Sequence, residues 1–490
     1  MKNYILAITA ILTLMVFSCS DDFTKRDPVY TVDSENYFNG EEDYNQALIG
    51  AYDLLQASYI NVMLGEIASD NTASGGESAT DVIGIQQIDD MIHTEVNANL
   101  KDIWDWMFAG VNRCNYILEF KDKTDFANKN QVLAETRFLR AYYNFELVKW
   151  FGAIPLSEDK RFTAADVTTI PRSPVPEVYA AIEADLIFAV ENLNPVPSQI
   201  GRATKGAALA LLGKAYLYQE KYTLAAQTFE TLINDSPYAL VANYSTIFEM
   251  SGENGPESVF EVQYTDLEGA GFPCLQCSEG NVAVGFSGVR SYAGPLYTSG
   301  FSFNVPRQEL VDAFADGDQR KDVAILDIVA WAAATGATYG TGFKHTGYFN
   351  RKYLPRTRSE DAEGDLNLTN PNNYRAIRYA DVLLMAAEAY NRGGIDDAKA
   401  REYLNQVRRR AFGNSNNDIN ASGPALTDFI LAERRVELAG EGHRFFDLVR
   451  TGKAAQEIDG FTPNKNEVFP IPFQEIQFSN GNWQQNPGYN

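Results

Sequence analysis

The chain has 490 residues, of which 45% are hydrophobic and 22% are charged, so it can bury one large core or two moderate ones. Its formal net charge of -24 at pH 7 argues against nucleic acid as a ligand, because nucleic-acid binding requires a positive surface that displaces counterions. The same charge disfavours strongly anionic polysaccharides, since long-range repulsion slows their approach.

The first residues are typical of a targeting segment and not of a folded element. Lys2 is followed by an apolar run from Tyr4 to Phe17, which is too short to cross a bilayer as a helix. The run ends in Val-Phe-Ser-Cys, which resembles a bacterial lipobox, and the Ser-Asp-Asp that follows resembles the export signal of surface lipoproteins in Bacteroidetes. We therefore expect a signal peptide at 1–18 and lipid attachment at Cys19, where several acyl chains together anchor stably. A signal-peptide cysteine without a role is the alternative.

Helical patterns dominate the chain as far as residue 237. Apolar residues recur at helical spacing in six segments: 41–59, 98–121, 129–150, 177–193, 203–219 and 222–234. The last two segments match the tetratricopeptide consensus in identity and spacing at Leu209, Leu212, Gly213, Tyr216, Ala225, Phe229, Leu232 and Pro237. The four earlier segments suggest two further helix pairs, and 383–407 contains a weaker copy of the repeat. Stacked helix pairs bury a continuous core between neighbours.

Two insertions have a different composition. Residues 259–264 alternate like a short strand, whereas 269–304 and 332–349 are rich in glycine, serine and aromatic residues. Loops of this length in a compact protein are functional or disordered, and the aromatic content argues against disorder. A second insertion, 65–97, separates paired helices.

Cys274 and Cys277 form a lone C-x-x-C motif in the glycine-rich stretch. Such a motif can be a redox-active pair, half of a zinc site or a small disulfide. The chain has no second C-x-x-C and only three scattered histidines, and disulfides are favoured outside the cytoplasm. We therefore expect a Cys274–Cys277 disulfide, no metal site and no cofactor.

The sequence lacks the nucleophile-elbow, zinc-protease, P-loop and dinucleotide motifs of common enzyme classes. With 65 acidic residues, carboxylate pairs occur at any spacing and do not indicate a glycosidase. One acidic cluster has regular spacing, because Glu433, Glu437 and Glu441 recur every four residues and share one helix face. We expect a structural salt-bridge network there, with neutralising charges from Arg434, Arg435 and Arg444.

The C-terminal third carries a series of short motifs. They are Glu433-Arg434, Glu437-Leu438, Glu441-Gly442, Arg444, Asp447-Leu448, Arg450-x-Gly452, Pro470-Ile471-Pro472 and Gln485-Asn486-Pro487-Gly488-Tyr489. In this order they resemble the C-terminal half of the SusD/RagB family of outer-membrane lipoproteins, which capture glycans or other nutrients for a TonB-dependent transporter. The resemblance implies a right-handed scaffold of four helix pairs, a location at the cell surface and a SusC-like transporter as partner.

Taken together, the patterns predict a mostly α protein built on a tetratricopeptide-like scaffold of about four helix pairs, with long irregular loop insertions and minor β structure. We expect a single intertwined domain over 19–490. Its helical scaffold is predicted at 41–237 and 375–450, its ligand loops at 238–374 and its C-terminal tail at 451–490.

A site that holds sugar by contact needs exposed aromatic rings for the C–H faces and polar groups for the hydroxyls. Trp104, Trp106, Trp150 and Trp483 are expected to pack in the core because of their helical position or their motif. Trp331 enters the loop AAATGATYGTGF and is the predicted stacking platform, with a core position at the end of a helix as the alternative. Further candidates are Tyr339, Tyr348, Tyr292, Tyr297 and Arg290 from the same loops, and Asp70 and Asn71 from a motif in 65–97 that resembles one near the family's ligand face.

The predicted function is capture of an oligosaccharide or polysaccharide at the cell surface and its delivery to the transporter without catalysis. The 65–97 insertion has no Trp, Tyr or Phe, unlike family members with a double-aromatic arc for helical glucan, so starch is disfavoured. Neutral β-glucan, fructan and mannan are all compatible with the sequence, and we favour a neutral β-glucan. Three alternatives stay open. They are a helical glycoside hydrolase or lyase, a scaffold that grips peptides, and capture of peptides or glycopeptides by the same family fold.

Overall fold

The computed structural model describes residues 37–235, 237–269, 271–356 and 361–489. The predicted signal peptide and Cys19 lie outside the described residues. Within the described part, no helix is long and apolar enough to cross a membrane.

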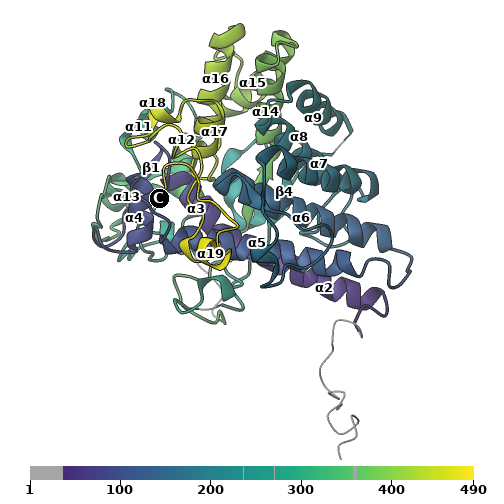
Figure 1. The fold of residues 1–490 in the computed structure, drawn as a ribbon. Helices are drawn as coiled ribbons and strands as arrows, with labels where there is room; N and C mark the ends of the chain where they lie inside the picture. The colour runs from purple at the N-terminus through teal and green to yellow at the C-terminus, as the bar shows by residue number, and fades with distance from the viewer. Residues whose placement is uncertain (1–36, 236, 270, 357–360, 490) are drawn as a thin grey trace, which may run out of the picture.

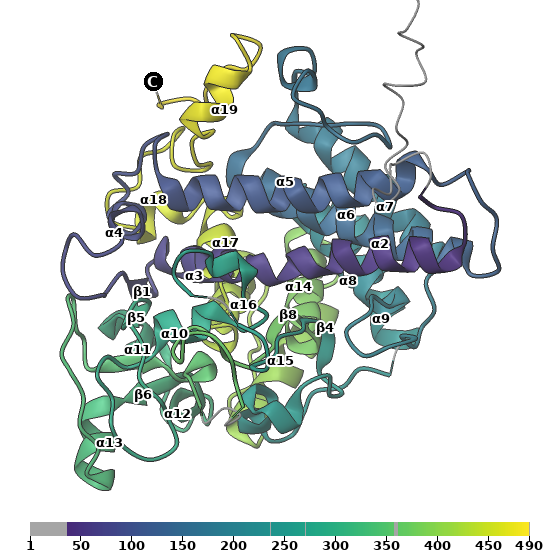
Figure 2. The same ribbon diagram turned by 90° about the horizontal axis from the view of Figure 1, so that it is seen from below.

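A stack of antiparallel helices forms one side of the molecule (Figure 1). Neighbours in sequence pack on each other from α5 to α9, and α9 then packs on α14, which follows much later in the chain. In Figure 2, α2 and α5 run side by side along the same stack. The stack consists of α2 (Glu41–Asp53), α5 (Ala98–Glu119), α6 (Lys129–Phe151), α7 (Val175–Asn192), α8 (Lys205–Tyr218), α9 (Tyr222–Asp235), α14 (Tyr379–Arg392) and α15 (Asp397–Phe412).

Local sequence signals set the ends of several of these helices. Asn97 begins α5 by accepting hydrogen bonds from the backbone of Asn99 and Leu100 at 3.1 Å, and Thr204 and Asp396 cap α8 and α15 in the same way. Proline near the first turn of α7 fits because the nitrogen there needs no intrahelical partner.

The tetratricopeptide consensus is explained by the contact between α8 and α9. Gly213 on α8 faces the ring of Phe229 on α9, and a Cβ atom at that glycine would lie only 2.4 Å from the ring. Because Gly213 has no side chain, the two helices can approach closely, while Phe229 fills the space between them. The mostly α fold with tetratricopeptide-like helix pairs is therefore confirmed.

The segment predicted as one helix over 41–59 is divided. After α2 the chain passes through the 3-10 helix η2 (Leu54–Ser58) into α3 (Tyr59–Ile67), whose residues are almost all buried. On the C-terminal side, α16 (Gly423–Glu437) packs on α14 and α17 (Arg444–Arg450) packs on α3. Segments from the N-terminal and the C-terminal parts of the chain therefore meet in the core. The C-terminal tail adds α18 (Ala454–Glu457) and α19 (Phe473–Phe478).

The strands are short and pair in four antiparallel two-stranded sheets. The predicted strand at 259–264 is observed as β4 (Ser258–Val262), and its partner is β8 (Tyr374–Arg378), directly before α14. The other pairs are β1 (Thr72–Ala73) with β5 (Val305–Pro306), β2 (Ile154–Pro155) with β3 (Arg172–Ser173), and β6 (Ile325–Asp327) with β7 (Tyr348–Asn350).

The aromatic loops form a region beside the helix stack, visible in green at the edge of Figure 2. Short helices lie in this part of the chain: α10 (Val282–Ser287), α11 (Gln308–Ala313), α12 (Lys321–Ala324) and α13 (Ile328–Thr335). This region has its own small hydrophobic cluster, separate from the main core. The 65–97 insertion contains α4 (Ile83–Asp89).

Candidate functional site

Four of the five predicted aromatic candidates lie in one small cluster. Trp331 and Tyr339 pack against a core that contains Tyr292 and Tyr297, together with Val289, Leu326, Ile328, Ala337, Phe349 and Leu354. Backbone hydrogen bonds join the two loops, from Ala293 to Thr338 at 2.9 Å in both directions and from Gly340 to Arg290 at 2.8 Å. Residues from the two glycine-rich stretches are thus brought together.

Trp331 lies in a helix and not in a loop. Asp327 caps α13 by accepting a hydrogen bond from the Ala330 nitrogen at 2.9 Å, and the helix ends at Gly336, whose φ of +75° is left-handed. The alanine run after Trp331 therefore continues the helix by one turn beyond the predicted loop entry. The indole remains half-buried at the surface of the cluster.

Two tyrosines fix the orientation of this indole. The Nε1 atom of Trp331 donates to the hydroxyl of Tyr292 at 3.0 Å, and that hydroxyl donates in turn to the Pro295 carbonyl at 2.7 Å. The ring of Tyr297 lies 5.5 Å from the indole at an angle of 53°. Tyr292 and Tyr297 are only 7% and 5% exposed. They therefore hold the indole in place from the buried side and have little surface that a ligand could contact.

Tyr339 and His345 lie beside this cluster with half-buried side chains. The predicted candidate Tyr348 does not join them, because it packs against a separate cluster that contains Leu310 and Phe314. The rings of Tyr339 and His345 lie 5.8 Å apart, and burial lowers the pKa of His345. The imidazole is therefore neutral at pH 7 and can act as donor and acceptor. These rings, with Trp331, form the surface that the cluster presents to solvent.

Arg290 connects the 65–97 insertion with the aromatic loops through hydrogen bonds and an ion pair. Its guanidinium donates to the Phe301 carbonyl at 2.9 Å and to the Ser302 hydroxyl at 3.2 Å, and it lies 3.5 Å from the carboxylate of Asp81. Backbone pairing of Phe343 with the Gly76 carbonyl at 2.9 Å joins the same segments. Arg290 is half-buried, so it orders the loops and still reaches the surface.

The structure gives Asp70 and Asn71 contacts away from the aromatic cluster. The Asp70 carboxylate accepts two hydrogen bonds from Arg444, at 2.8 and 2.9 Å, and lies 2.9 Å from Arg435. The buried Asn71 amide donates to Glu66 and accepts from Arg435, each at 2.9 Å. Both side chains join α3 to the C-terminal third.

The regularly spaced glutamates form a buried ionic network, but with partners other than those predicted. Arg378 contacts Glu437 at 2.8 Å and Glu441 at 2.7 Å, and Arg320 contacts Glu433 at 2.7 Å and Glu437 at 2.9 Å. Arg408, Arg410 and Lys352 complete the neutralisation.

Arg434 and Arg435 point elsewhere because neighbours on a helix are rotated by about 100°, and Arg444 lies on α17, a different helix. Arg434 pairs with Asp381 at 2.7 Å and with Asp447 at 2.8 Å, while Arg435 and Arg444 pair with Asp70. Glu441 also lies beyond the end of α16, which stops at Glu437. Sequence reasoning missed Arg320, Arg378 and Lys352, and no local signal links these distant positions to the glutamates.

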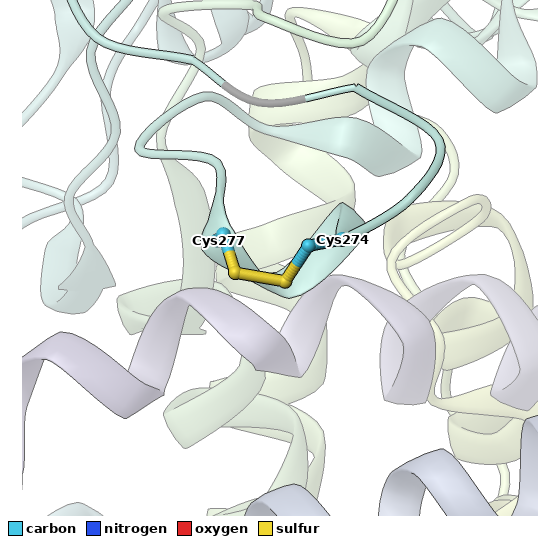
Figure 3. The surroundings of a disulfide bond; sticks show 2 residues. All are labelled: Cys274 and Cys277. Carbon is cyan, nitrogen blue, oxygen red and sulfur yellow. A yellow bond between two sulfur atoms is a disulfide. The ribbon is translucent and has the colours of Figure 1, made fainter.

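Cys274 and Cys277 form a disulfide bond with their Cα atoms 5.3 Å apart (Figure 3). Among the described residues, no group of three histidine, cysteine or carboxylate side chains could hold a metal ion.

A concave surface lies elsewhere, at α5 and the C-terminal tail. It has a volume of about 300 Å³ and is lined by aromatic residues with carboxylates, notably Trp104, Phe108, Phe162, Trp483, Asp105 and Glu475. Trp104, Trp150 and Trp483 are buried, as expected of core residues, while Trp106 is half-buried and packs against the core. This hollow is a rival position for a sugar and needs a separate test.

Comparison with known proteins identifies the family. The SusD family model matches residues 256–489, and a model described as starch-binding associating with outer membrane matches residues 24–217. A solved laminarin binding SusD-like protein is 35% identical, covers 92% of this chain and 100% of its own, and superposes with a TM-score of 0.85. The chain belongs to the SusD family.

Other similar proteins also match this chain over nearly its whole length. Surface glycan-binding protein A from Bacteroides thetaiotaomicron, solved in complex with laminarihexaose, is 26% identical with a TM-score of 0.80 and covers 91% of this chain and 99% of its own. SusD-like protein P2 from Formosa agariphila is 27% identical over 518 residues, covering 100% of both chains. The likeness therefore extends over nearly the whole length of this SusD-family protein.

Proposed function

We propose that this SusD-family protein binds a glycan at the cell surface by contact and delivers it, uncut, to a SusC-like TonB-dependent transporter. The observation that carries the proposal is the geometry of Trp331. Its indole is half-buried, and Tyr292 and Tyr297 fix it from beneath. A ring held in one orientation loses little conformational freedom when a ligand stacks on it.

The chemistry around Trp331 suits a sugar. The C–H face of a pyranose is apolar and stacks on an aromatic ring, while its hydroxyls need donors and acceptors at the rim. Tyr339 and His345 supply both functions from the neighbouring loop, and Arg290 supplies donors from the other loop. We therefore propose Trp331 as the platform and these three residues as its polar surroundings.

A neutral β-linked glucan is the ligand class we favour. Two of the similar solved proteins are described by their binding of laminarin or laminarihexaose, which are β-glucans. The net charge of -24 also disfavours anionic polysaccharides through long-range repulsion. Both arguments point to an uncharged polymer.

We propose binding without cleavage, in contrast to a hydrolase or lyase on the same glycans. A retaining or inverting hydrolase needs two carboxyl groups placed on either side of the scissile bond. The regularly spaced cluster Glu433, Glu437 and Glu441 is buried, and arginine and lysine side chains occupy its oxygens. These carboxylates support the fold and are inaccessible to a polymer.

The placement of the protein at the cell surface rests on the N-terminal segment and on the family. One matched model describes proteins that associate with the outer membrane. We propose that Cys19, outside the described residues, carries the lipid anchor, and that the transporter partner follows from membership of the family. Co-purification from native outer membranes should recover a TonB-dependent transporter, and its absence would contradict the delivery step.

Isothermal titration of the mature protein against a glycan panel tests the binding step. The panel contains laminarin, cereal β-glucan, starch oligosaccharides and mannan, and each mixture is assayed for new reducing ends. We expect binding of a neutral β-glucan with no increase in reducing ends. Release of reducing ends would contradict contact-only capture, and an absence of binding to every glycan in the panel would contradict carbohydrate as the ligand.

A further inference from the structure

The Cys274–Cys277 disulfide lies at the tip of a loop whose residues 271–279 contact the scaffold. The Thr265 nitrogen donates to the Glu279 carbonyl at 2.8 Å and closes the base of the loop, and the Cys274 nitrogen donates to the Gly271 carbonyl at 3.0 Å. The disulfide then fixes the turn between these hydrogen bonds (Figure 3).

Side chains of the same loop fasten it to the helical core. The Glu279 carboxylate accepts a hydrogen bond from Gln56 in η2 at 2.7 Å, and Leu275 packs against the main hydrophobic core. Figure 3 shows the disulfide directly above the N-terminal helices. These contacts hold residues 271–279 against the scaffold.

This loop presents an aromatic ring to solvent. Phe272 is 57% exposed, although one side of its ring contacts Phe301 edge to face, with centroids 5.4 Å apart at 71°. Phe301 in turn lies 5.8 Å from Phe286 of α10. The contact with Phe301 orients Phe272 and leaves much of its surface open, which is the condition for stacking on an apolar ligand face.

Direct contacts connect Phe272 with the proposed sugar site. The carbonyl of Phe301 accepts the hydrogen bond of Arg290, and the carbonyl of Arg290 accepts the hydrogen bond of Gly340, next to Tyr339. A chain of direct contacts thus leads from Phe272 through Phe301 and Arg290 to the cluster that holds Trp331. A polymer that followed these contacts from Trp331 past Arg290 would reach the disulfide loop.

We propose that Phe272 is a second stacking platform for the same glycan, used only by chains long enough to extend from Trp331 past Arg290. This inference rests on the proposed function. The disulfide has a physical role in it, because a loop held in its bound conformation loses less entropy when the ligand binds. Phe272 then raises the affinity for long chains and does not affect which sugar binds at Trp331.

Length dependence provides the test. Titrations compare laminarin with the shortest laminari-oligosaccharide that binds the wild type, using the full mature chain. Phe272→Ala should weaken laminarin binding about fivefold, the value of one aromatic contact, and leave the short oligosaccharide unaffected. Phe272→Tyr should retain the wild-type affinity for both ligands. Phe478→Ala is the matched control, since Phe478 is 65% exposed on α19 and lies outside the proposed surface.

The disulfide gives an independent second variant. Cys274→Ser combined with Cys277→Ser should reproduce the selective loss of laminarin affinity, because the loop is no longer held at its tip. An unchanged laminarin affinity in Phe272→Ala, or an equal loss for both ligands, would overturn the second platform.

The same titrations separate this inference from the proposed function. If Trp331→Ala leaves the short oligosaccharide bound as in the wild type, then the primary site is misplaced, whatever the result at Phe272. If Phe272→Ala keeps both affinities but abolishes co-purification with a transporter, then the loop is a protein contact and the second platform is contradicted.

Discussion

Arg378 and Glu441 form a buried ion pair with two parallel hydrogen bonds, from Nε to Oε2 at 2.8 Å and from Nη2 to Oε1 at 2.7 Å. Arg378 belongs to β8 at the edge of the ligand-loop segment, and Glu441 follows α16 in the C-terminal third. The same guanidinium contacts Glu437 and Glu257. One arginine therefore links three parts of the chain inside the core.

Breaking this network should destabilise the protein strongly. Burial acts to raise the pKa of Glu437, but Arg410, Arg378 and Arg320 outweigh it and hold that pKa well below its usual range. Glu437→Gln leaves these arginines with one negative charge fewer, and removal of one partner from a buried pair costs about 3–5 kcal/mol. Urea unfolding measures the loss.

The matched control for that variant is Glu191→Gln, an exposed glutamate at the end of α7. Its free energy of unfolding should stay within about 0.5 kcal/mol of the wild type. Equal stabilities of Glu437→Gln and Glu191→Gln would contradict the structural role of the network.

Stability should fall on acidification, with His443 as one cause. Burial, followed by the positive charge of Lys214, lowers the pKa of His443 from 6.5 to about 3. The Nδ1 atom of His443 lies 3.4 Å from the Lys214 ammonium, which can only donate, so the folded protein keeps the imidazole neutral. The unfolded chain binds more protons between pH 6.5 and 3, and stability decreases as the pH falls through that window.

Urea unfolding at pH 7 and at pH 5 measures this effect. We expect a lower free energy of unfolding at pH 5 for the wild type and a smaller difference for His443→Gln, which does not titrate. Below pH 4.5, protonation of Glu437 and Glu441, whose pKa values are also lowered, should add a further loss. A pH-independent stability from 7 to 5 would contradict the buried neutral state of His443.

The orientation of Trp331 should depend on the hydroxyl of Tyr292. Tyr292→Phe removes the acceptor of the indole hydrogen bond but keeps the ring that fills the cluster. A lost hydrogen bond of this kind is worth about 1 kcal/mol, so we expect a roughly fivefold weaker glycan affinity with little change in melting temperature. Isothermal titration with the glycan that the wild type binds measures the affinity, and scanning calorimetry measures the melting temperature. Unchanged affinity would show that the indole is held by packing alone.

The main helices and the motifs of the C-terminal third were predictable because each depends on local spacing. Gly213 and Phe229 belong to one repeat unit, and their contact follows from the consensus. The position of Trp331 was harder, because an alanine-rich run ending in glycine is compatible with a loop or with a short helix. In the structure the run forms a helix, and Asp327 caps its first turn.

The partners of the buried glutamates could not be predicted from one sequence. Arg320, Lys352 and Arg378 lie tens of residues away from Glu437, and only the tertiary fold brings them together. Asn71 illustrates the same limit, since a polar residue in an insertion is compatible with a ligand contact or a buried amide. In the structure it bonds Glu66 and Arg435.

Attachment to the membrane should depend on Cys19. Cys19→Ala removes the sulfur that the proposed lipid modification requires, so the protein should move from the membrane fraction to the soluble fraction of the cells or the medium. Cys114→Ala is a suitable control, because Cys114 is a buried thiol in α5 and should not alter the location. Immunoblots of the fractions show the outcome. A Cys19→Ala protein that remains in the membrane fraction would contradict lipid anchoring at this residue.

The most direct test of the account is calorimetric titration of Trp331→Ala with the glycan that the wild type binds, next to Phe108→Ala in the hollow at α5. We expect Trp331→Ala to abolish binding or weaken it strongly, with a melting temperature near that of the wild type, and Phe108→Ala to bind normally. Normal glycan binding by Trp331→Ala, or a loss of binding confined to Phe108→Ala, would contradict the proposed site.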